Sequence, residues 1–172
     1  MRALVELILE RGFDAITVSE IAERADVGRS TFYAHYADKE DLLQGAVDSL
    51  RTFLQQHVDE AVRHPEPGEH PALAFCLPML EHAAEHRDLF DAMVGKRGGY
   101  LILELFHDMW ADLVRSGWPD ADEVAVQTIV GGFGSTVSWW LNAAPELEPP
   151  EVVRRFRRLI DPALPGPGRF TP

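Results

Sequence analysis

The segment at residues 17–43 constrains the fold of this chain most, because it predicts two short helices around a tight turn with a third helix directly after them. Thr17 and Glu20 have the spacing of a capping box, in which each residue caps the other at a helix N-terminus. Asp26 stands where the chain must turn, since Asp tolerates a left-handed backbone. Val27 is expected to be the buried residue that holds the two crossed helices together, as in a helix-turn-helix.

The second short helix is expected to begin at Gly28 and to carry a polar outer face. Phe32 and Tyr36 are one turn apart and are expected to point inward. Asp38 is a good N-cap for the helix that follows. The groups left outside are small or form hydrogen bonds, which suits the major groove of DNA. They are Arg29, Ser30, Thr31, Ala34 and His35.

Residues from about Ala3 to Leu43 closely resemble the N-terminal domain of the TetR/AcrR family of transcriptional regulators. The most specific part, TFYAHYADKEDLL at residues 31–43, is similar to the family signature Tyr-x-His-Phe-x-x-Lys-x-x-Leu. The resemblance implies that Tyr33 and Lys39 hold DNA phosphates, with Thr17 as a third backbone contact. It assigns base reading mainly to Arg29, because a guanidinium can bind guanine through two hydrogen bonds. The predicted DNA-binding residues are Thr17, Gly28, Arg29, Ser30, Thr31, Tyr33, His35 and Lys39.

Three departures from the family pattern bear on DNA binding. Gly28 stands where Ser or Thr is common, and Asp26 replaces the usual Gly with an acidic group. The sequence begins a turn or two before Leu7, so half of the family's first helix and its basic arm are missing. If translation starts at Met1, weak DNA affinity is expected, because phosphate contacts supply most non-specific binding.

Net charge does not by itself indicate a nucleic-acid-binding protein. The chain has a formal net charge of −12, and residues 1–45 contain more acidic than basic side chains. However, no acid occurs between Val27 and Ala37, where Arg29 and His35 lie. Local charge matters more than total charge at contact distance. Steeply salt-dependent, site-specific DNA binding is therefore expected.

Composition and periodicity predict an all-α protein with two linked domains. The chain has 172 residues, 46% of them hydrophobic, which is enough for one sizeable core beside a small head. The expected parts are a DNA-binding domain at residues 1–45, a ligand-binding and dimerisation domain at 46–164, and a disordered tail at 165–172. No stretch is long enough to span a membrane, and the single Cys76 excludes an intramolecular disulfide. A soluble, cytoplasmic protein with a buried thiol is expected.

Helical periodicity continues beyond the head. An apolar stripe predicts a long helix up to the break at residues 64–68, with later breaks at 85–88, 95–99 and 116–120. Two final helices are expected near 121–144 and 150–160. Pro78 allows two interpretations, a kink within a helix or a residue in its first turn.

The second domain is rich in residues that can line an apolar cavity, and the family resemblance implies a ligand pocket there. Each of them also fits an ordinary core position. The predicted pocket residues are Phe75, Met79, His82, Phe90, Met93, Tyr100, Leu103, Phe106, Met109 and Trp110. His82 and His86 have a spacing that suits a metal on one helix face, but two exposed histidines are the simpler interpretation. No cofactor, metal or catalytic motif is predicted.

Small residues at helical spacing near the C-terminus favour close approach of a second helix, and the partner is expected to be another copy of the chain. The final helix has an apolar face and an arginine face, the latter read as solvated rather than as a nucleic-acid site. The predicted dimer interface comprises Thr128, Gly131, Gly132, Ser135, Ser138, Val152, Phe156 and Leu159.

The sequence therefore predicts a transcriptional regulator that binds a near-palindromic operator as a homodimer, most simply a repressor released by a small apolar effector. Its expected partners are double-stranded operator DNA, a second copy of itself and that effector, with no membrane. Two alternatives remain open. One is a ligand-binding dimer whose head no longer binds DNA, and the other is a helical metalloenzyme built on the histidines.

Overall fold

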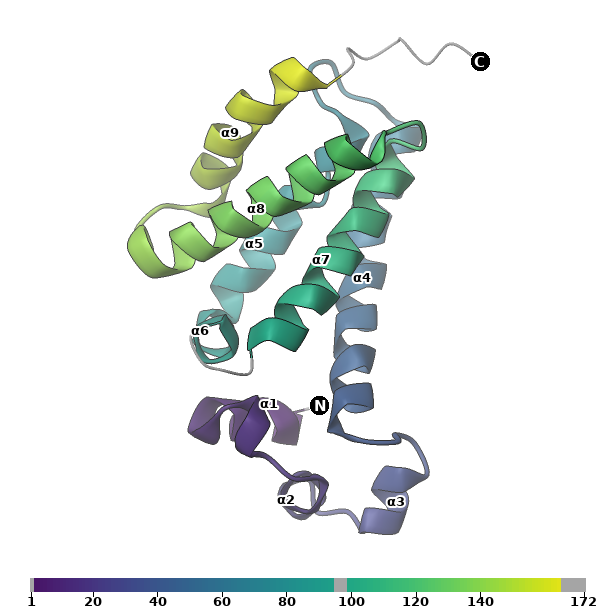
Figure 1. Ribbon diagram of the computed structural model, residues 1–172, viewed down its shortest axis with the longest axis vertical. Coiled ribbons are helices and arrows are strands. Elements are labelled where there is room, and N and C mark those ends of the chain that lie inside the picture. Colours follow the sequence, from purple (N-terminus) through teal and green to yellow (C-terminus); the bar gives the residue numbers. More distant parts are fainter. Residues whose placement is uncertain (1, 95–98, 165–172) are drawn as a thin grey trace. The chain divides into compact units, whose positions relative to one another are not determined.

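The computed structural model describes residues 2–94 and 99–164, with side chains for residues 2–90 and 104–164, and every regular element in these ranges is helical. The predicted all-α fold is thus confirmed (Figure 1). The α-helices are α1 (Arg2–Arg11), α2 (Val18–Arg24), α3 (Arg29–Tyr33), α4 (Lys39–Arg63), α5 (Cys76–Glu85), α6 (Arg87–Val94), α7 (Gly99–Gly117), α8 (Glu123–Ala143) and α9 (Pro149–Ile160). Short 3-10 helices are η1 (Phe13–Ala15), η2 (Pro71–Leu73) and η3 (Asp161–Ala163).

The chain divides into two compact units. The first combines Met1–Leu50 with His86–Phe106, and the second combines Arg51–Glu85 with His107–Pro172. The division therefore falls inside α4 and α7. The domain boundary after residue 45 remains a prediction. The first unit also includes α6, because α6 packs on α1.

The first unit is built on α1. Leu4, Leu7 and Ile8 are each 1% exposed and form its core with apolar residues of the following helices. Three ion pairs join α1 to α2: Arg24 to Glu10 at 2.7 Å, Arg24 to Glu6 at 3.5 Å, and Arg11 to Glu20 at 2.7 Å. Further buried apolar residues of this unit are Ala3, Phe13, Ile16, Ile21, Ala22, Phe32, Leu42, Leu43, Val47, Leu50, Phe90 and Phe106.

The capping box and the tight turn have the predicted geometry. The Glu20 N–H donates to Thr17 Oγ1 at 3.4 Å, and the Thr17 N–H donates to Glu20 Oε2 at 2.8 Å. Asp26 has a φ of 54°, which places it in the left-handed region. Val27, however, is 42% exposed, so the prediction that it is buried was wrong. Its backbone closes the turn instead, because its N–H donates to the carbonyl oxygen of Ala22 at 2.9 Å.

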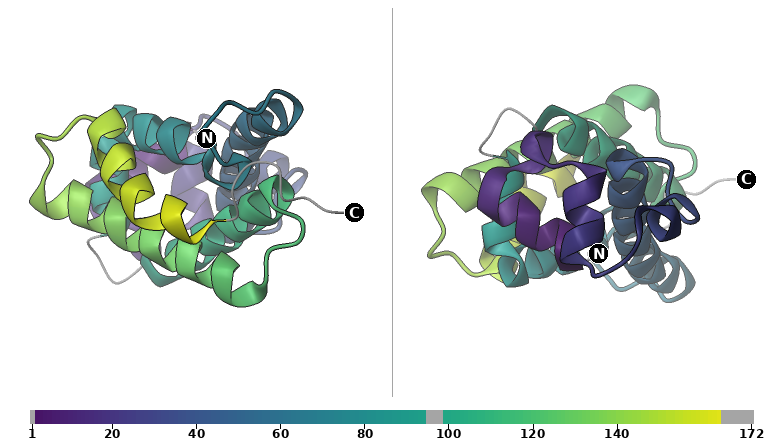
Figure 2. Two further views of the ribbon diagram at one scale, coloured as in Figure 1. Left: turned by 90° about the horizontal axis from the view of Figure 1, so that it is seen from above. Right: turned by 90° about the horizontal axis from the view of Figure 1, so that it is seen from below.

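The second unit is centred on Phe133 of α8, whose side chain is fully buried. Three aromatic rings surround it, with centroid distances of 5.3 Å to Phe75, 5.0 Å to Trp110 and 5.5 Å to Phe156. These rings come from α7, α9 and the residue before α5. The views from two directions show α8 and α9 side by side (Figures 1 and 2). One aromatic cluster thus joins four segments of the second unit.

The ends of the helices follow local sequence signals. Pro78 is the third residue of α5, so the interpretation that places it in the first turn is confirmed. α4 ends at Arg63, just before the break predicted at residues 64–68. Cys76 is buried, and burial raises the pKa of its thiol. In the described part of the chain, no helix has the length and apolar character needed to cross a membrane.

Candidate DNA-binding site and ligand-binding unit

The candidate recognition helix, α3, is short and is held by one buried ring. Phe32 is 6% exposed and lies 5.7 Å from the half-buried ring of Tyr36, as its predicted inward position requires. Gly28 precedes α3 and provides no side-chain cap. The side chains that the sequence placed on the outer face are exposed: Arg29, Ser30, Thr31, Tyr33, Ala34 and His35. α3 therefore presents hydrogen-bonding groups to solvent while a single aromatic residue anchors it.

Arg29 differs from the other cations of residues 2–50, because no hydrogen bond or ion pair engages its guanidinium. Arg2 pairs with Glu6 at 2.8 Å, and Arg11 and Arg24 make the pairs between α1 and α2 described above. Lys39 is also engaged, as described next. In this part of the chain, Arg29 is therefore the cation available to an incoming anion or base.

The ammonium group of Lys39 points into its own unit. Its Nζ donates to the carbonyl oxygens of Phe13 at 3.0 Å, Asp14 at 3.3 Å and Ile16 at 3.0 Å. It also lies 4.7 Å from the centroid of the Phe13 ring. Because an ammonium has three donors, these carbonyls use its full hydrogen-bonding capacity. The family resemblance gave no sign of this orientation.

Thr17 is also engaged within its own helix cap. Its hydroxyl donates to Glu20 Oε2 at 2.8 Å while accepting from the Glu20 N–H. Hydrogen bonds from the backbone and side chain of Thr17 lower the pKa of the Glu20 carboxyl, and Arg11 adds to this effect. A phosphate at Thr17 would therefore meet an ionised carboxylate close by. Its predicted backbone contact remains untested.

Lys39 is preceded by a capping arrangement at the start of α4. The Asp41 N–H donates to Asp38 Oδ1 at 2.8 Å, as the N-cap prediction requires. The Ala37 N–H in turn donates to Asp41 Oδ2 at 2.9 Å. These two bonds fix the chain between α3 and α4, and so limit the positions that Tyr33 and His35 adopt.

The predicted ligand-pocket residues with described side chains are buried or half-buried, and they belong to two different units. Phe90 stacks on Phe106 at 5.6 Å in the first unit. In the second unit Phe75, Met79, Met109 and Trp110 are between 0% and 4% exposed, and His82 is half-buried. The side chains of Met93, Tyr100 and Leu103 lie outside the described residues. Their predicted role as a pocket remains a prediction.

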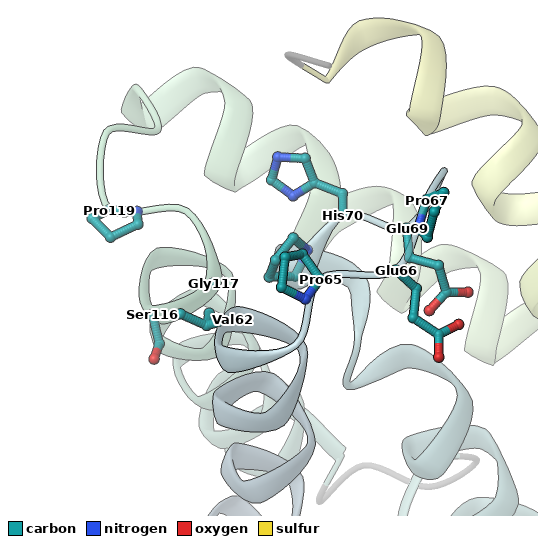
Figure 3. Close-up of a pocket in the computed structure, with 10 residues that line it drawn as sticks. Val62, Pro65, Glu66, Pro67, Glu69, His70, Ser116, Gly117 and Pro119 are labelled. Carbon is teal, nitrogen blue, oxygen red and sulfur yellow. The ribbon is translucent and has the colours of Figure 1, made fainter. Parts of the chain in front are cut away.

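A cavity of about 740 Å³ lies elsewhere in the second unit, where the loops after α4 and after α7 meet (Figure 3). Val62, Pro65 and Gly117 contribute to its wall, and His70 lines it from the loop between α4 and α5. The sequence predicted only a helix break in this proline-containing loop. The prolines at positions 65, 67 and 71 were the signal available, because they hold a loop open that cannot continue a helix.

His70 has an unusual environment in this loop. The Ala72 N–H donates to its Nδ1 at 3.2 Å, so the neutral ring carries its proton on Nε2. That Nε2 is buried and has no hydrogen-bond partner among the described residues. Burial lowers the pKa of His70; Asp161 opposes the shift and Arg157 adds to it. The imidazole therefore acts as a neutral N-cap for η2 and not as a charged group.

The two histidines considered for a metal site do not belong to the same helix. His82 lies in α5, which ends at Glu85, and His86 follows that end. The break predicted near His86 is thus confirmed.

The predicted dimer surface separates into exposed and buried parts. Thr128, Gly131 and Ser135 are exposed on α8, and Ser138 is half-buried. On α9, Leu159 is 78% exposed. In contrast, Val152 and Phe156 are 0% and 4% exposed, and a Cβ at Gly132 would lie 3.5 Å from the Phe156 ring. These three residues join α8 to α9 within one chain, because that face of α9 covers the aromatic cluster.

Comparison with known proteins matches the first unit to a described family. Residues 1–46 match the model for "Bacterial regulatory proteins, tetR family". Residues 1–46 thus form a TetR-family N-terminal domain. An uncharacterised HTH-type transcriptional regulator of Bacillus subtilis, YxbF, is 28% identical over 187 residues, covering 95% of this chain and 47% of YxbF. The chain thus spans about half the length of the curated relatives it matches.

Solved structures of TetR-like regulators share the fold. The fatty acid degradation regulator FadR from Bacillus halodurans has a TM-score of 0.69 at 19% identity, over 95% of this chain and 97% of that one. Thermus thermophilus FadR, a TetR-family transcriptional repressor solved with lauroyl-CoA, has a TM-score of 0.62 at 20% identity, over 99% and 96% of the two chains. The TetR-family head and helical body of this chain therefore have experimentally determined counterparts.

Proposed function

We propose that this TetR-family regulator is a cytoplasmic repressor that binds a near-palindromic operator as a homodimer and leaves it when a small apolar effector binds. The observation that carries the proposal is the exposed face of α3, with Arg29 as its unengaged cation. The expected outcome is recognition through α3 in the major groove, since the N-terminal residues of a recognition helix contact base edges.

Arg29 is proposed as the base-reading residue and Tyr33 as the main phosphate contact. The Tyr33 side chain is 57% exposed, which leaves its hydroxyl free to donate to a phosphate oxygen. Ser30, Thr31 and His35 supply further short-range hydrogen bonds, and the absence of a side chain at Gly28 lets the backbone approach closely. Arg29 would thus determine which base sequence is bound, and Tyr33 would determine how the protein is positioned on the duplex.

The exposed face of α8 supports the homodimer. Gly131 lies near its middle, and a Cβ there would meet nothing within 4 Å in its own chain. Apolar side chains flank it on the same face, Val124 at 75% and Trp139 at 44% exposure. A glycine between exposed apolar groups suits close contact with a second α8, and Leu159 of α9 extends the apolar surface.

The buried apolar side chains of the second unit support the proposal of a small apolar effector. Binding would require the core around Phe75, Met79 and Trp110 to open, at a free-energy cost that the effector must offset. A ligand that favours one state by about 1–3 kcal/mol changes operator affinity roughly five- to 150-fold. Because two FadR structures of this fold hold lauroyl-CoA or stearoyl-CoA, long-chain acyl-CoA belongs in the first effector screen.

DNA binding is tested with duplexes from the region upstream of the regulator's own gene, compared with scrambled duplexes of equal length. Arg29→Ala is expected to lower specific affinity by about five- to 150-fold, as loss of a bidentate guanine contact implies. Arg29→Lys keeps the charge but not the paired geometry, so it should restore non-specific binding only. Tyr33→Phe should weaken binding to all duplexes alike.

If Arg29→Ala bound the specific duplex with unchanged affinity, the proposal that α3 reads the operator bases through Arg29 would be wrong. No binding by a wild-type protein that forms dimers would favour the alternative of a head that no longer binds DNA. The acidic excess of the first unit and Asp26 are the observations that favour this second candidate.

The dimer is tested by substituting Gly131 with Gln, which fits within one chain but obstructs a close helix pair. Ala84→Gln on the exposed face of α5 is the matched control. Sedimentation equilibrium should show dimers for the wild type and the control but monomers for Gly131→Gln. Dimers of unchanged affinity in Gly131→Gln would exclude the α8 face as the interface.

A further inference from the structure

We propose that Lys39 is a positioning residue that closes the base of the helix-turn-helix, and that it makes no phosphate contact. The inference rests on the proposed function, and it differs from the role that the family resemblance implies for this lysine. It follows from where the ammonium lies and from which parts of the chain its contacts join.

Lys39 and its contact residues lie on opposite sides of the helix-turn-helix in the sequence. Lys39 is the first residue of α4, directly after the segment that contains α2 and α3. Its carbonyl partners at Phe13, Asp14 and Ile16 lie directly before that segment. Ile16 is adjacent to Thr17, the N-cap of α2. The ammonium therefore joins the two ends of the helix-turn-helix at one point.

The local environment favours this arrangement over a contact with DNA. The carbonyls of Phe13, Asp14 and Ile16 converge on one cation, and hydrogen bonds to a charged group contribute about 1.5–3 kcal/mol each at most. The Phe13 ring, which is 5% exposed, covers the ammonium at 4.7 Å and adds a cation–π contact. A phosphate would have to compete with these carbonyls for the same three N–H groups.

Closure at this point has a consequence for recognition. α3 has only five residues and is held to the unit by Phe32. With so little anchoring of its own, its orientation depends on the two chain segments that lead into and out of it. Lys39 fixes these segments relative to each other, so it acts on base reading through α3.

Two substitutions separate positioning from phosphate binding. Lys39→Arg keeps the positive charge, but a planar guanidinium cannot direct three donors at three converging carbonyls. Lys39→Met keeps a similar length and removes the charge. Binding to the upstream duplex and to its scrambled counterpart is measured across a salt series, at a temperature where circular dichroism shows each variant folded. Tyr33→Phe provides the comparison for a lost phosphate contact.

For a positioning residue, both Lys39 variants should lose about tenfold or more in specific affinity. Binding to the scrambled duplex and the salt slope should stay at the wild-type values. If Lys39 bound a phosphate, Lys39→Met would instead have a lower affinity for both duplexes, and its salt slope would be smaller by about one. Lys39→Arg would then bind DNA like the wild type. A merely stabilising residue would lower the melting temperature without changing the ratio of specific to non-specific affinity. Either of the last two results would overturn the proposal.

A measurement without DNA keeps this inference separate from the proposed function. Amide hydrogen exchange across residues 13–36 should accelerate in both Lys39 variants, while exchange in α8 stays at the wild-type rate. If the wild type binds no DNA, the proposed function fails, and the exchange data still decide whether Lys39 closes the unit. Unchanged exchange across residues 13–36 would overturn the closure.

Discussion

Asp26 gives the turn of the helix-turn-helix its positive φ of 54° and places a carboxylate near the start of α3. These two properties can be separated. Asp26→Asn should leave the free energy of unfolding unchanged, because Asn also tolerates the left-handed region, and should raise operator affinity a few-fold by removing a charge that repels phosphate. Asp26→Val removes the same charge but should cost about 1–2 kcal/mol, because a β-branched residue is strained at this φ. Urea unfolding and DNA titration together check both results, and equal stability of the two variants would contradict the backbone argument.

His70 makes stability depend on pH in a predictable direction. Burial lowers the pKa of His70 in the folded protein below its ordinary value of about 6.5, so the unfolded chain binds the proton first as the pH falls. The free energy of unfolding should therefore decrease as the pH falls through about 6.5 toward the folded-state pKa. The charges of Asp161 and Arg157 act on this pKa in opposite directions, and each has a smaller effect than burial.

His70→Asn is the control for this prediction, because Asn accepts from the Ala72 N–H and does not titrate. Denaturant unfolding between pH 5 and pH 8, a range of about three units around the ordinary pKa, should show less loss of stability at low pH for the variant than for the wild type. Parallel pH profiles for both proteins would show that other groups dominate.

At this scale, the sequence predicted contacts between residues that are close along the chain. The Thr17–Glu20 box and the Asp38 cap have the expected bonds, because three-residue spacing fixes both partners. The orientation of Lys39 depends on carbonyls more than twenty residues earlier, and no local pattern indicates them. Val27 was misassigned because its backbone, not its side chain, closes the turn.

Two glycines in helices have opposite surroundings, although the sequence alone does not distinguish them. A Cβ at Gly117 would lie 2.6 Å from the Ala72 nitrogen and 2.6 Å from the Pro71 carbonyl carbon, and both are backbone atoms that cannot move independently. Gly117→Ala should therefore cost about 1–3 kcal/mol through overpacking. Gly131→Ala should stabilise the protomer by about 0.5–1 kcal/mol, because its Cβ enters open space.

Urea unfolding at two protein concentrations checks this pair, because it separates the stability of the protomer from that of a dimer. Equal effects of the two substitutions would contradict the close approach of α7 to η2.

Periodicity predicted the helices well, but not which neighbours their faces contact. The limits of α4, α5, α8 and α9 agree with the predicted breaks to within a few residues. The apolar face of α9 was assigned to a partner chain, whereas Val152 and Phe156 cover the aromatic cluster of their own unit. An amphipathic pattern shows that a face is buried and gives no information about what buries it.

The whole chain has 28 acidic and 16 basic side chains, so moderate salt should act in opposite directions on folding and on DNA binding. Raising sodium chloride from about 0.05 to 0.3 M shortens the range of repulsion between like charges and should increase the free energy of unfolding. The same change displaces the protein from DNA, because the counterions released on binding enter a more concentrated salt solution and their release contributes less free energy. Unfolding and DNA titrations in the same buffers check this prediction, and a fall in stability with salt would show that the surface ion pairs outweigh the net repulsion.

The discontinuous first unit has a consequence for how such regulators recombine. α6 packs on α1 although it lies more than seventy-five residues later in the sequence. A single recombination crossover therefore cannot transfer the whole first unit to another regulator. A graft that exchanges only residues 1–50 would pair a new α1 with an α6 selected for another surface. Chimeras that exchange residues 1–50 and 86–106 together keep that interface intact. A regulator that acquires a new operator preference by recombination therefore needs both segments from the same parent.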